Sequence, residues 1–292
     1  MADQLINWFP GHMAKTKREM EQSIKLVDVV VELLDARAPK SSKNPYLDEL
    51  WSRRPRVIAL NKSDLADAEL SGHWTNYYKA QGFEVVLLDS LHGNGLKLIS
   101  QAADRLMKTK NEARKAKGMK IQPTKLMISG IPNVGKSTLI NQMAKRSDAA
   151  KTGNKPGVTK SNQWIKLQNG MLLLDTPGIL WPKFEDQEAA LRLAFIGSIS
   201  DEINDTYTLA VKLLDQLLGT YPKLLMARYK LSEEDLNLTG EALIEVIGRK
   251  RGHLKSGGEV DLERCARMLL DEFRNGKIGR ITLEDVVSES EN

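Results

Sequence analysis

The sequence predicts an α/β protein with a mainly parallel sheet, followed by a smaller all-helical domain. Three observations lead to this prediction. Short apolar runs alternate with helical segments through the first 185 residues, which is typical of parallel sheets covered on both faces. A glycine-rich segment at residues 130–138 follows one of these runs and opens a helix. From residue 186 onward the apolar spacing is helical, so we place the domains at residues 1–185 and 186–292.

The expected elements run in order along the chain. A basic amphipathic helix is expected over residues 11–25, before the first strand. A lysine-rich stretch separates the third strand from the fourth, and it is either a solvated helix with a linker or a contact for a polyanion. The expected strands are the apolar parts of VDVVVELLDAR (27–37), RVIALNKSD (56–64), FEVVLLDS (83–90), KLMISG (125–130), QWIKL (163–167) and GMLLLDTPG (170–178).

The bulk composition is that of a globular protein. The net charge of +5 is modest and only weakly favours a polyanionic partner. The single cysteine, Cys265, excludes a disulfide within the chain. The apolar stretch at residues 26–34 contains two acids and is too short to span a bilayer, and no secretory signal is recognisable. We expect a cytoplasmic monomer with no membrane partner.

The segment GIPNVGKST at residues 130–138 matches the phosphate-binding pattern G-x-x-x-x-G-K-[ST]. Its glycines allow the backbone N–H groups to wrap around phosphates, and the following helix directs its dipole at them. Lys136 would reach the β- and γ-phosphates, and Ser137 would bind Mg²⁺. An ordinary strand–turn–helix corner is the alternative. The predicted contacts are Asn133, Val134, Gly135, Lys136, Ser137 and Thr138.

Two later motifs would complete the phosphate and metal site. Asp175 ends an apolar strand in LLLDTPG and suits a Mg²⁺ site, and the N–H of Gly178 can approach a γ-phosphate. Thr159 in KPGVT is the candidate switch residue, whose hydroxyl would join Mg²⁺ only when the γ-phosphate is present. A plain surface loop is the alternative for that segment.

The tetrapeptide NKSD comprises Asn61, Lys62, Ser63 and Asp64, and it ends another apolar strand. The Asp64 carboxylate would accept hydrogen bonds from guanine N1–H and N2–H₂. Adenine lacks this donor pair, so a site built around Asp64 would reject ATP. Asn61 would support both the base and the phosphate loop, and the stem of Lys62 would lie over the base. These features predict GTP and GDP as ligands, together with Mg²⁺.

A second base contact is expected at Asp89 and Ser90, which follow the next strand. GTPases commonly have Ser-Ala in the corresponding loop, whereas this chain has Ser90 followed by Leu91. An ordinary turn between strand and helix is an equally good interpretation of this segment.

The base reader precedes the phosphate loop, which is the reverse of the usual order in GTPases. A cyclic change of order preserves the neighbours within a sheet, so we expect a P-loop GTPase domain with a circularly permuted motif order. The chain resembles the circularly permuted GTPases of ribosome assembly over nearly its whole length. The shared motifs are WFPGHM, DARAP, NKSD, GIPNVGKST, GVT, DTPGILWPKF and KRGHLKSGG. The resemblance implies GTP hydrolysis coupled to late maturation of the large ribosomal subunit, with the helical domain on ribosomal RNA.

Many GTPases position the attacking water with a glutamine, but Ile179 occupies that place here. The resemblance implies that His12 supplies the missing catalytic group, alongside Lys136; the alternative is a structural or RNA-contacting histidine. It also implies that Asn133 helps to hold K⁺ beside the phosphates, where a plain loop residue is the alternative.

Three functions remain open from the sequence. The chain is a GTPase switch acting on the large-subunit precursor, its RNA and its proteins, or an RNA-binding protein with a structural nucleotide site. The third is a GTPase with a non-ribosomal client. The intact motifs at Lys136, Ser137, Thr159 and Asp175 argue against an inactive site. The basic segment at residues 248–258 would contact phosphates or form a solvated loop.

Overall fold

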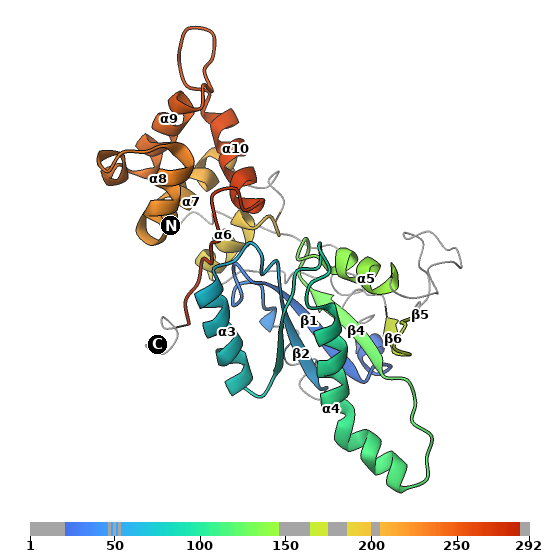
Figure 1. Cartoon of the computed structure of the whole chain (residues 1–292). Coiled ribbons are helices and arrows are strands. Elements are labelled where there is room, and N and C mark those ends of the chain that lie inside the picture. Colours follow the sequence, from blue (N-terminus) through green and yellow to red (C-terminus); the bar gives the residue numbers. More distant parts are fainter. Residues whose placement is uncertain are drawn as a thin grey trace. The chain divides into compact units, whose positions relative to one another are not determined.

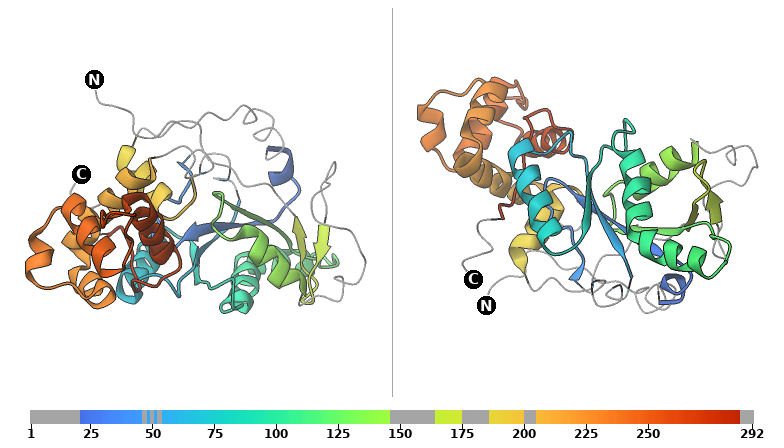
Figure 2. Two further views of the ribbon diagram at one scale, coloured as in Figure 1. Left: turned by 90° about the horizontal axis from the view of Figure 1, so that it is seen from above. Right: turned by 60° about the horizontal axis from the view of Figure 1, so that its bottom comes forward.

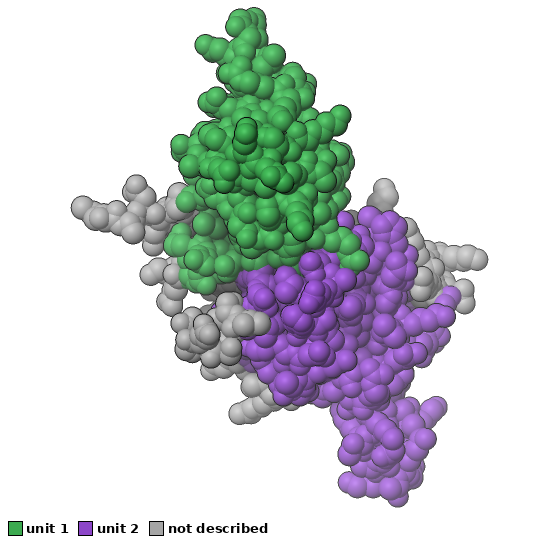
Figure 3. Space-filling model, turned by 60° about the vertical axis from the view of Figure 1, so that its left-hand side comes forward, with its two compact units in different colours: residues 1–8, 183–283 green, residues 9–182, 284–292 purple. Residues whose placement is uncertain are grey.

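The computed structural model describes residues 21–45, 48, 51, 54–145, 164–174, 186–199 and 205–286, and these form two compact units (Figure 3). The described residues up to 174 form one unit together with residues 284–286. Those between 186 and 283 form the other unit. Residues 284–286 therefore belong to the unit that contains the sheet, although residues 275–283 before them belong to the helical unit.

The first unit is built on a six-stranded sheet with the order β3-β2-β1-β4-β6-β5 (Figure 1). All neighbours are parallel except β5 and β6, which confirms the predicted mainly parallel sheet. β1 is buried along its whole length, as expected for a central strand that is covered on both faces. The strands are β1 Val29–Asp35, β2 Arg56–Asn61, β3 Glu84–Leu87, β4 Lys125–Gly130, β5 Trp164–Lys166 and β6 Leu172–Leu174.

Helices cover both faces of this sheet (Figures 1 and 2). α3 (Ala68–Ala80) lies on one side of the strands, whereas α4 (Leu96–Ala116) and α5 (Lys136–Lys145) lie on the other. The alternation follows from right-handed crossovers, because β2–α3–β3 runs toward one edge of the sheet and β3–α4–β4 runs back. Much of the lysine-rich stretch forms the end of α4.

The face covered by α3 contains an aromatic core. Trp74 and Tyr78 of α3 are buried against Leu34, Ile58 and Leu60 of the strands, and Val286 packs against the same cluster. The indole N–H of Trp74 donates to the carbonyl oxygen of Glu284 at 3.1 Å. The last described residues are thus anchored on the sheet unit by both apolar and polar contacts.

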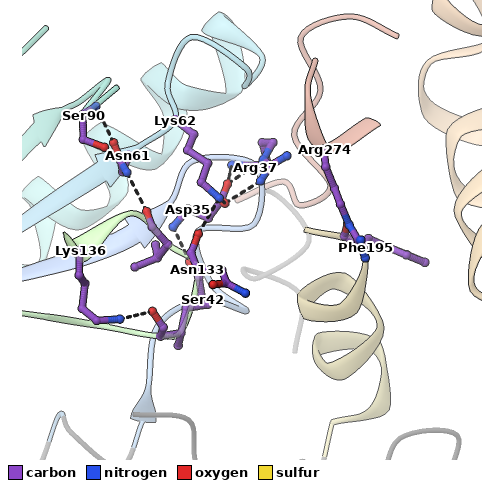
Figure 4. Close-up of polar contacts among 12 residues, drawn as sticks. Asp35, Arg37, Ser42, Asn61, Lys62, Ser90, Asn133, Lys136, Phe195 and Arg274 are labelled. Atoms are coloured by element: carbon purple, nitrogen blue, oxygen red, sulfur yellow. Dashed lines mark hydrogen bonds and ion pairs between the residues drawn. The ribbon is translucent and has the colours of Figure 1, made fainter. Parts of the chain in front are cut away.

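The second unit is helical in its described residues. Its central helix α7 packs against α6, α8, α9 and α10. Arg274 of α10 links that helix to α6, because its guanidinium donates to the carbonyl oxygens of Ala194 and Phe195 at 2.8 and 3.0 Å, at the C-terminal end of α6 (Figure 4). The elements are α6 Gln187–Phe195, α7 Thr206–Thr220, α8 Pro222–Tyr229, the short 3₁₀ helix η3 Glu234–Asn237, α9 Gly240–Lys250 and α10 Leu262–Arg274.

Across the described residues, no helix combines the length and apolar character needed to cross a membrane.

Candidate functional site

The predicted base and phosphate motifs meet at the carboxyl edge of the sheet. β1 lies between β2 and β4, and its register pairs Asp35 with Asn61 on one side and Leu33 with Gly130 on the other. β3 ends beside β2, so the loop that begins at Leu88 joins the same edge. Figure 4 shows Asn61, Ser90 and the phosphate loop lying together. The sheet therefore brings together motifs that are far apart in the sequence.

The phosphate loop has a backbone that requires glycine at two positions. A Cβ atom on Gly130 would lie 2.5 Å from the carbonyl oxygen of Leu33. Gly135 has φ +106°, and a Cβ atom there would lie 2.3 Å from the Asn61 side-chain nitrogen. Asn133, between them, adopts a left-handed conformation with φ +58°. The loop thus follows a tight path against β1 and the base-reading motif, which only this placement of glycines permits.

Asn61 connects the phosphate loop with the second base loop. Its Nδ2 donates to the carbonyl oxygen of Val134 at 2.7 Å, and its Oδ1 accepts from the N–H of Ser90 at 3.0 Å. Both groups of the amide are used and the residue is 1% exposed. A buried amide with both ends satisfied fixes the spacing between the two loops.

Asp64 is exposed at the same edge, where a ligand can reach it. Ser63 holds the turn, since its hydroxyl donates to the carbonyl oxygen of Leu88 at 3.0 Å. The carboxylate of Asp89 accepts from His92 and from the Asn94 side chain, so it stabilises its own loop. Burial opposes ionisation of Asp89, but these hydrogen bonds outweigh it and hold the pKa of its carboxyl below the usual value.

Lys136 begins α5 and is 9% exposed. Its ammonium donates to the carbonyl oxygen of Ile131 at 2.5 Å, within its own loop. Burial lowers the pKa of Lys136 to about 8. Among the described residues no acid raises the pKa of this ammonium, so the site contains a buried cation that a phosphate would stabilise. Ser137 is exposed in the first turn of α5 and Thr138 is half-buried.

A charged cluster at this edge joins the predicted residue Lys62 to two buried residues, Asp35 and Arg37, that are not among the candidate site residues from the sequence. The Asp35 carboxylate contacts the guanidinium of Arg37 at 2.8–2.9 Å and the ammonium of Lys62 at 3.0 Å. The same ammonium donates to the carbonyl oxygen of Asn133 at 2.9 Å (Figure 4). Asp35 and Arg37 belong to DARAP, which the sequence presents only as a shared motif. An acid at the end of the strand beside NKSD is the signal that would have indicated this cluster.

The remaining predicted residues lie outside the described part of the chain. They are His12, Thr159, Asp175, Gly178 and Ile179. The roles assigned to them from the sequence stay predictions.

The comparisons with known proteins agree with this geometry. A family model described as 50S ribosome-binding GTPase matches residues 125–241, which begin at β4. A Bacillus cereus protein named ribosome biogenesis GTPase A is 46% identical over 96% of this chain and 94% of its own length. The chain belongs to the ribosome biogenesis GTPase A family. A member from Thermotoga maritima is 33% identical, over 96% of this chain and 94% of its own.

Solved structures support the same assignment. A GDP-bound YlqF structure covers 92% of this chain and all of its own, with a TM-score of 0.66 and 28% identity. The GNP-bound YlqF structure from T. maritima covers 93% of this chain and 98% of its own, with a TM-score of 0.63 and 28% identity. The expected resemblance, the P-loop GTPase fold and the enzyme class are thus confirmed. The protein hydrolyses GTP, and guanine nucleotides are the ligands of this family.

Proposed function

We propose that this GTPase binds the immature large ribosomal subunit and promotes its late assembly, in the cytoplasm and as a monomer. The observation that carries the proposal is the meeting of NKSD, the Ser90 loop and the phosphate loop at one sheet edge in a chain of this family. The relatives are named for ribosome biogenesis, and the family model is described as 50S ribosome-binding. The ribosomal RNA and proteins of that particle are the proposed partners.

Different residues of the site bind the base, fix the spacing of the loops and contact the phosphates. Asp64, exposed beside the Ser90 loop, accepts the two guanine donors, and Asn61 holds the base loop and phosphate loop at a fixed separation. Lys136 releases the Ile131 carbonyl and turns its ammonium to the phosphates. The backbone of residues 133–138 surrounds those phosphates at the N-terminus of α5. Asp64 therefore supplies specificity, and the loop supplies charge stabilisation.

Two cations fit the same loop. The exposed Ser137 hydroxyl would bind Mg²⁺ together with Thr159 and Asp175, and the side chain of Asn133, also exposed, would help to hold K⁺. Both ions would offset negative charge on the phosphates. Gly178 would contact the γ-phosphate, and His12 would position the attacking water in place of a glutamine.

The basic segment at residues 248–258 is the proposed RNA contact of the helical unit. Lys250 is held by Asp235 and by the carbonyl oxygen of Lys230, and Arg251 lies over the ring of Tyr229. Arg249 and Lys255 are exposed, and residues 255–258 form an exposed turn. Phosphate contacts by these side chains would give salt-dependent affinity without reading the base sequence.

The decisive experiment measures GTP hydrolysis by the purified chain with and without isolated large subunits or their precursors, at two salt concentrations. We expect stimulation by the large-subunit particle that weakens at the higher salt. Equal rates with large subunits, small subunits and no particle would contradict the proposed partner. Replacing Arg249 and Lys255 together by glutamine should weaken particle binding while leaving GDP affinity unchanged. His12→Ala should lose the stimulated rate but keep GDP binding.

A further inference from the structure

The carboxylate of Asp35 lies at the end of β1 and is inaccessible to solvent. Its own strand places it there, because the β1–β2 register pairs Asp35 with Asn61, the first residue of NKSD. The Ala36 N–H donates to the carbonyl oxygen of Asn61 at 2.8 Å, and the Asp35 N–H donates to the Ser42 hydroxyl at 3.0 Å. The backbone on both sides of the carboxylate is therefore fixed.

Arg37 makes that carboxylate rigid. Its Nε and Nη2 donate to the two carboxylate oxygens at 2.9 and 2.8 Å, and its backbone N–H donates to Oδ1 at 3.1 Å. The guanidinium is itself 1% exposed. Burial alone would raise the pKa of Asp35, but the charges of Arg37 and Lys62 outweigh it and hold that pKa well below its usual range. The group is thus a fixed anion beneath the nucleotide loops.

Lys62 joins this anion to the phosphate loop. Its ammonium is 3.0 Å from Oδ2 of Asp35 and 2.9 Å from the carbonyl oxygen of Asn133. Lys62 and Asn133 both have φ +58°, a left-handed conformation that few residues other than glycine adopt and that lysine adopts less readily than asparagine. A lysine stem is flexible in solution, so an unheld Lys62 would lose conformational freedom each time a nucleotide bound.

We propose that Asp35 and Arg37 are positioning residues for the guanine nucleotide, which hold Lys62 across the phosphate loop before the nucleotide binds. The inference rests on the proposed nucleotide roles of Lys62 and the phosphate loop, and it extends them to the DARAP motif. Asp35 is 0% and Arg37 is 1% exposed, so both would act on the nucleotide through other residues. Their effect on affinity passes through the Lys62 ammonium and the Asn133 carbonyl.

A double-mutant cycle on the full chain tests this inference. The titrated ligand is fluorescent GDP, and the variants are Asp35→Asn, Lys62→Met and their combination. Each single change should weaken binding by about tenfold or more, because a charged hydrogen bond that organises the site is lost. In the Lys62→Met background, Asp35→Asn should change the GDP affinity by less than about twofold, because the ammonium that Asp35 positions is absent.

A second variant guards against loss of folding. Asp35→Asn removes the Asp35 carboxylate that the buried Arg37 contacts, whereas Asp35→Asn with Arg37→Gln removes both charges of that pair. The combination of Asp35→Asn and Arg37→Gln should weaken GDP binding when Lys62 is present. When Lys62 is replaced by methionine, the same combination should cause no further loss of GDP affinity. Arg105→Gln is the matched control, because Arg105 forms an exposed bidentate pair with Glu84 in the same unit. It should bind GDP like the unmodified chain.

GDP binding by the unmodified chain tests the nucleotide site, and the variants test the positioning role of Asp35 and Arg37. An unmodified chain that binds no GDP would overturn the proposed nucleotide site itself. If the unmodified chain binds GDP but the affinity losses of Asp35→Asn and Lys62→Met multiply in the double variant, the nucleotide site stands and the positioning role is overturned. Unchanged GDP affinity in the folded variant with both Asp35→Asn and Arg37→Gln would also overturn the positioning role.

Discussion

The ammonium of Lys62 and the carbonyl oxygen of Asn133 are 2.9 Å apart, and both residues have φ +58°. One hydrogen bond therefore joins two left-handed residues from loops that follow different strands. Asn133 contributes its backbone carbonyl to this hydrogen bond, whereas the proposed K⁺ site would use its side chain. The backbone and side-chain roles of Asn133 can be tested separately.

Asn133→Gly should retain GDP affinity and lose any stimulation of hydrolysis by K⁺. Glycine accepts φ +58° without strain and keeps the carbonyl acceptor for Lys62, while the side chain is removed. Hydrolysis rates in potassium and sodium buffers, with GDP affinity measured in parallel, check this prediction. Asn133→Val is the contrasting variant, because a β-branched residue is strained there and should weaken GDP binding as well. Full potassium stimulation in Asn133→Gly would rule out the side-chain role.

GDP affinity should fall as the pH rises above 8. The pKa of Lys136 in the free site is about 8, because burial disfavours its charged form. A phosphate favours that charged form, so binding raises the pKa and takes up a proton at alkaline pH. Below pH 8 the ammonium is already charged, and above it the affinity should fall by up to about tenfold per pH unit. Fluorescent-GDP titrations between pH 7 and 9 measure the slope.

Lys136→Arg is the control for that slope, because a guanidinium stays charged throughout this range. Its affinity, even if lower overall, should depend less on pH. The same slope in both proteins would assign the pH dependence to another group.

Glu32→Gln should stabilise the protein at pH 8 and have little effect at pH 4.5. Glu32 lies within β1 and is 1% exposed; burial raises its pKa to about 7 from 4.5, although Lys43 and Arg56 favour its charged form. The native state therefore keeps a proton that the unfolded chain releases, and stability falls as the pH rises from about 4.5 to about 7. Above that range the buried carboxylate costs up to about 3 kcal/mol, which glutamine avoids. Urea unfolding at the two pH values checks the difference, and equal effects at both would contradict it.

Glu284→Ala should destabilise the sheet unit. The buried carboxylate of Glu284 accepts from the backbone N–H groups of Lys40 and Ser41 at 2.7 and 3.0 Å and from the Ser41 hydroxyl. Removing it takes the acceptor away from the N–H and hydroxyl of the buried Ser41, with an expected loss of about 2–3 kcal/mol. Urea unfolding of the full chain measures the change.

Glu263→Ala is the matched control for Glu284. Glu263 is 76% exposed and pairs with Arg267 at 3.5 Å one helical turn away, so its loss should cost less than about 0.5 kcal/mol. Similar losses in the two variants would show that the anchored carboxylate contributes no more than a surface charge.

Much of the site could be predicted because each nucleotide motif is local. A phosphate loop is a continuous run of backbone N–H groups between a strand and a helix, so GIPNVGKST is recognisable without its surroundings. NKSD at the end of an apolar strand is similarly self-contained, and the alternation of strands and helices predicts the parallel sheet. The order of these motifs was enough to predict the permuted topology.

The tertiary structure decided which groups hold those motifs in place. Lys62 and Asn133 are 71 positions apart, and Glu284 lies 243 positions from Ser41. No local pattern links such residues, because their contacts depend on strand order, on register and on the packing of residues 284–286 within the sheet unit. Asp35 shows the difference most clearly. The sequence by itself determined that an acid ends β1, and only the pairing of β1 with β2 and β4 made that acid the partner of Lys62 beneath the phosphate loop.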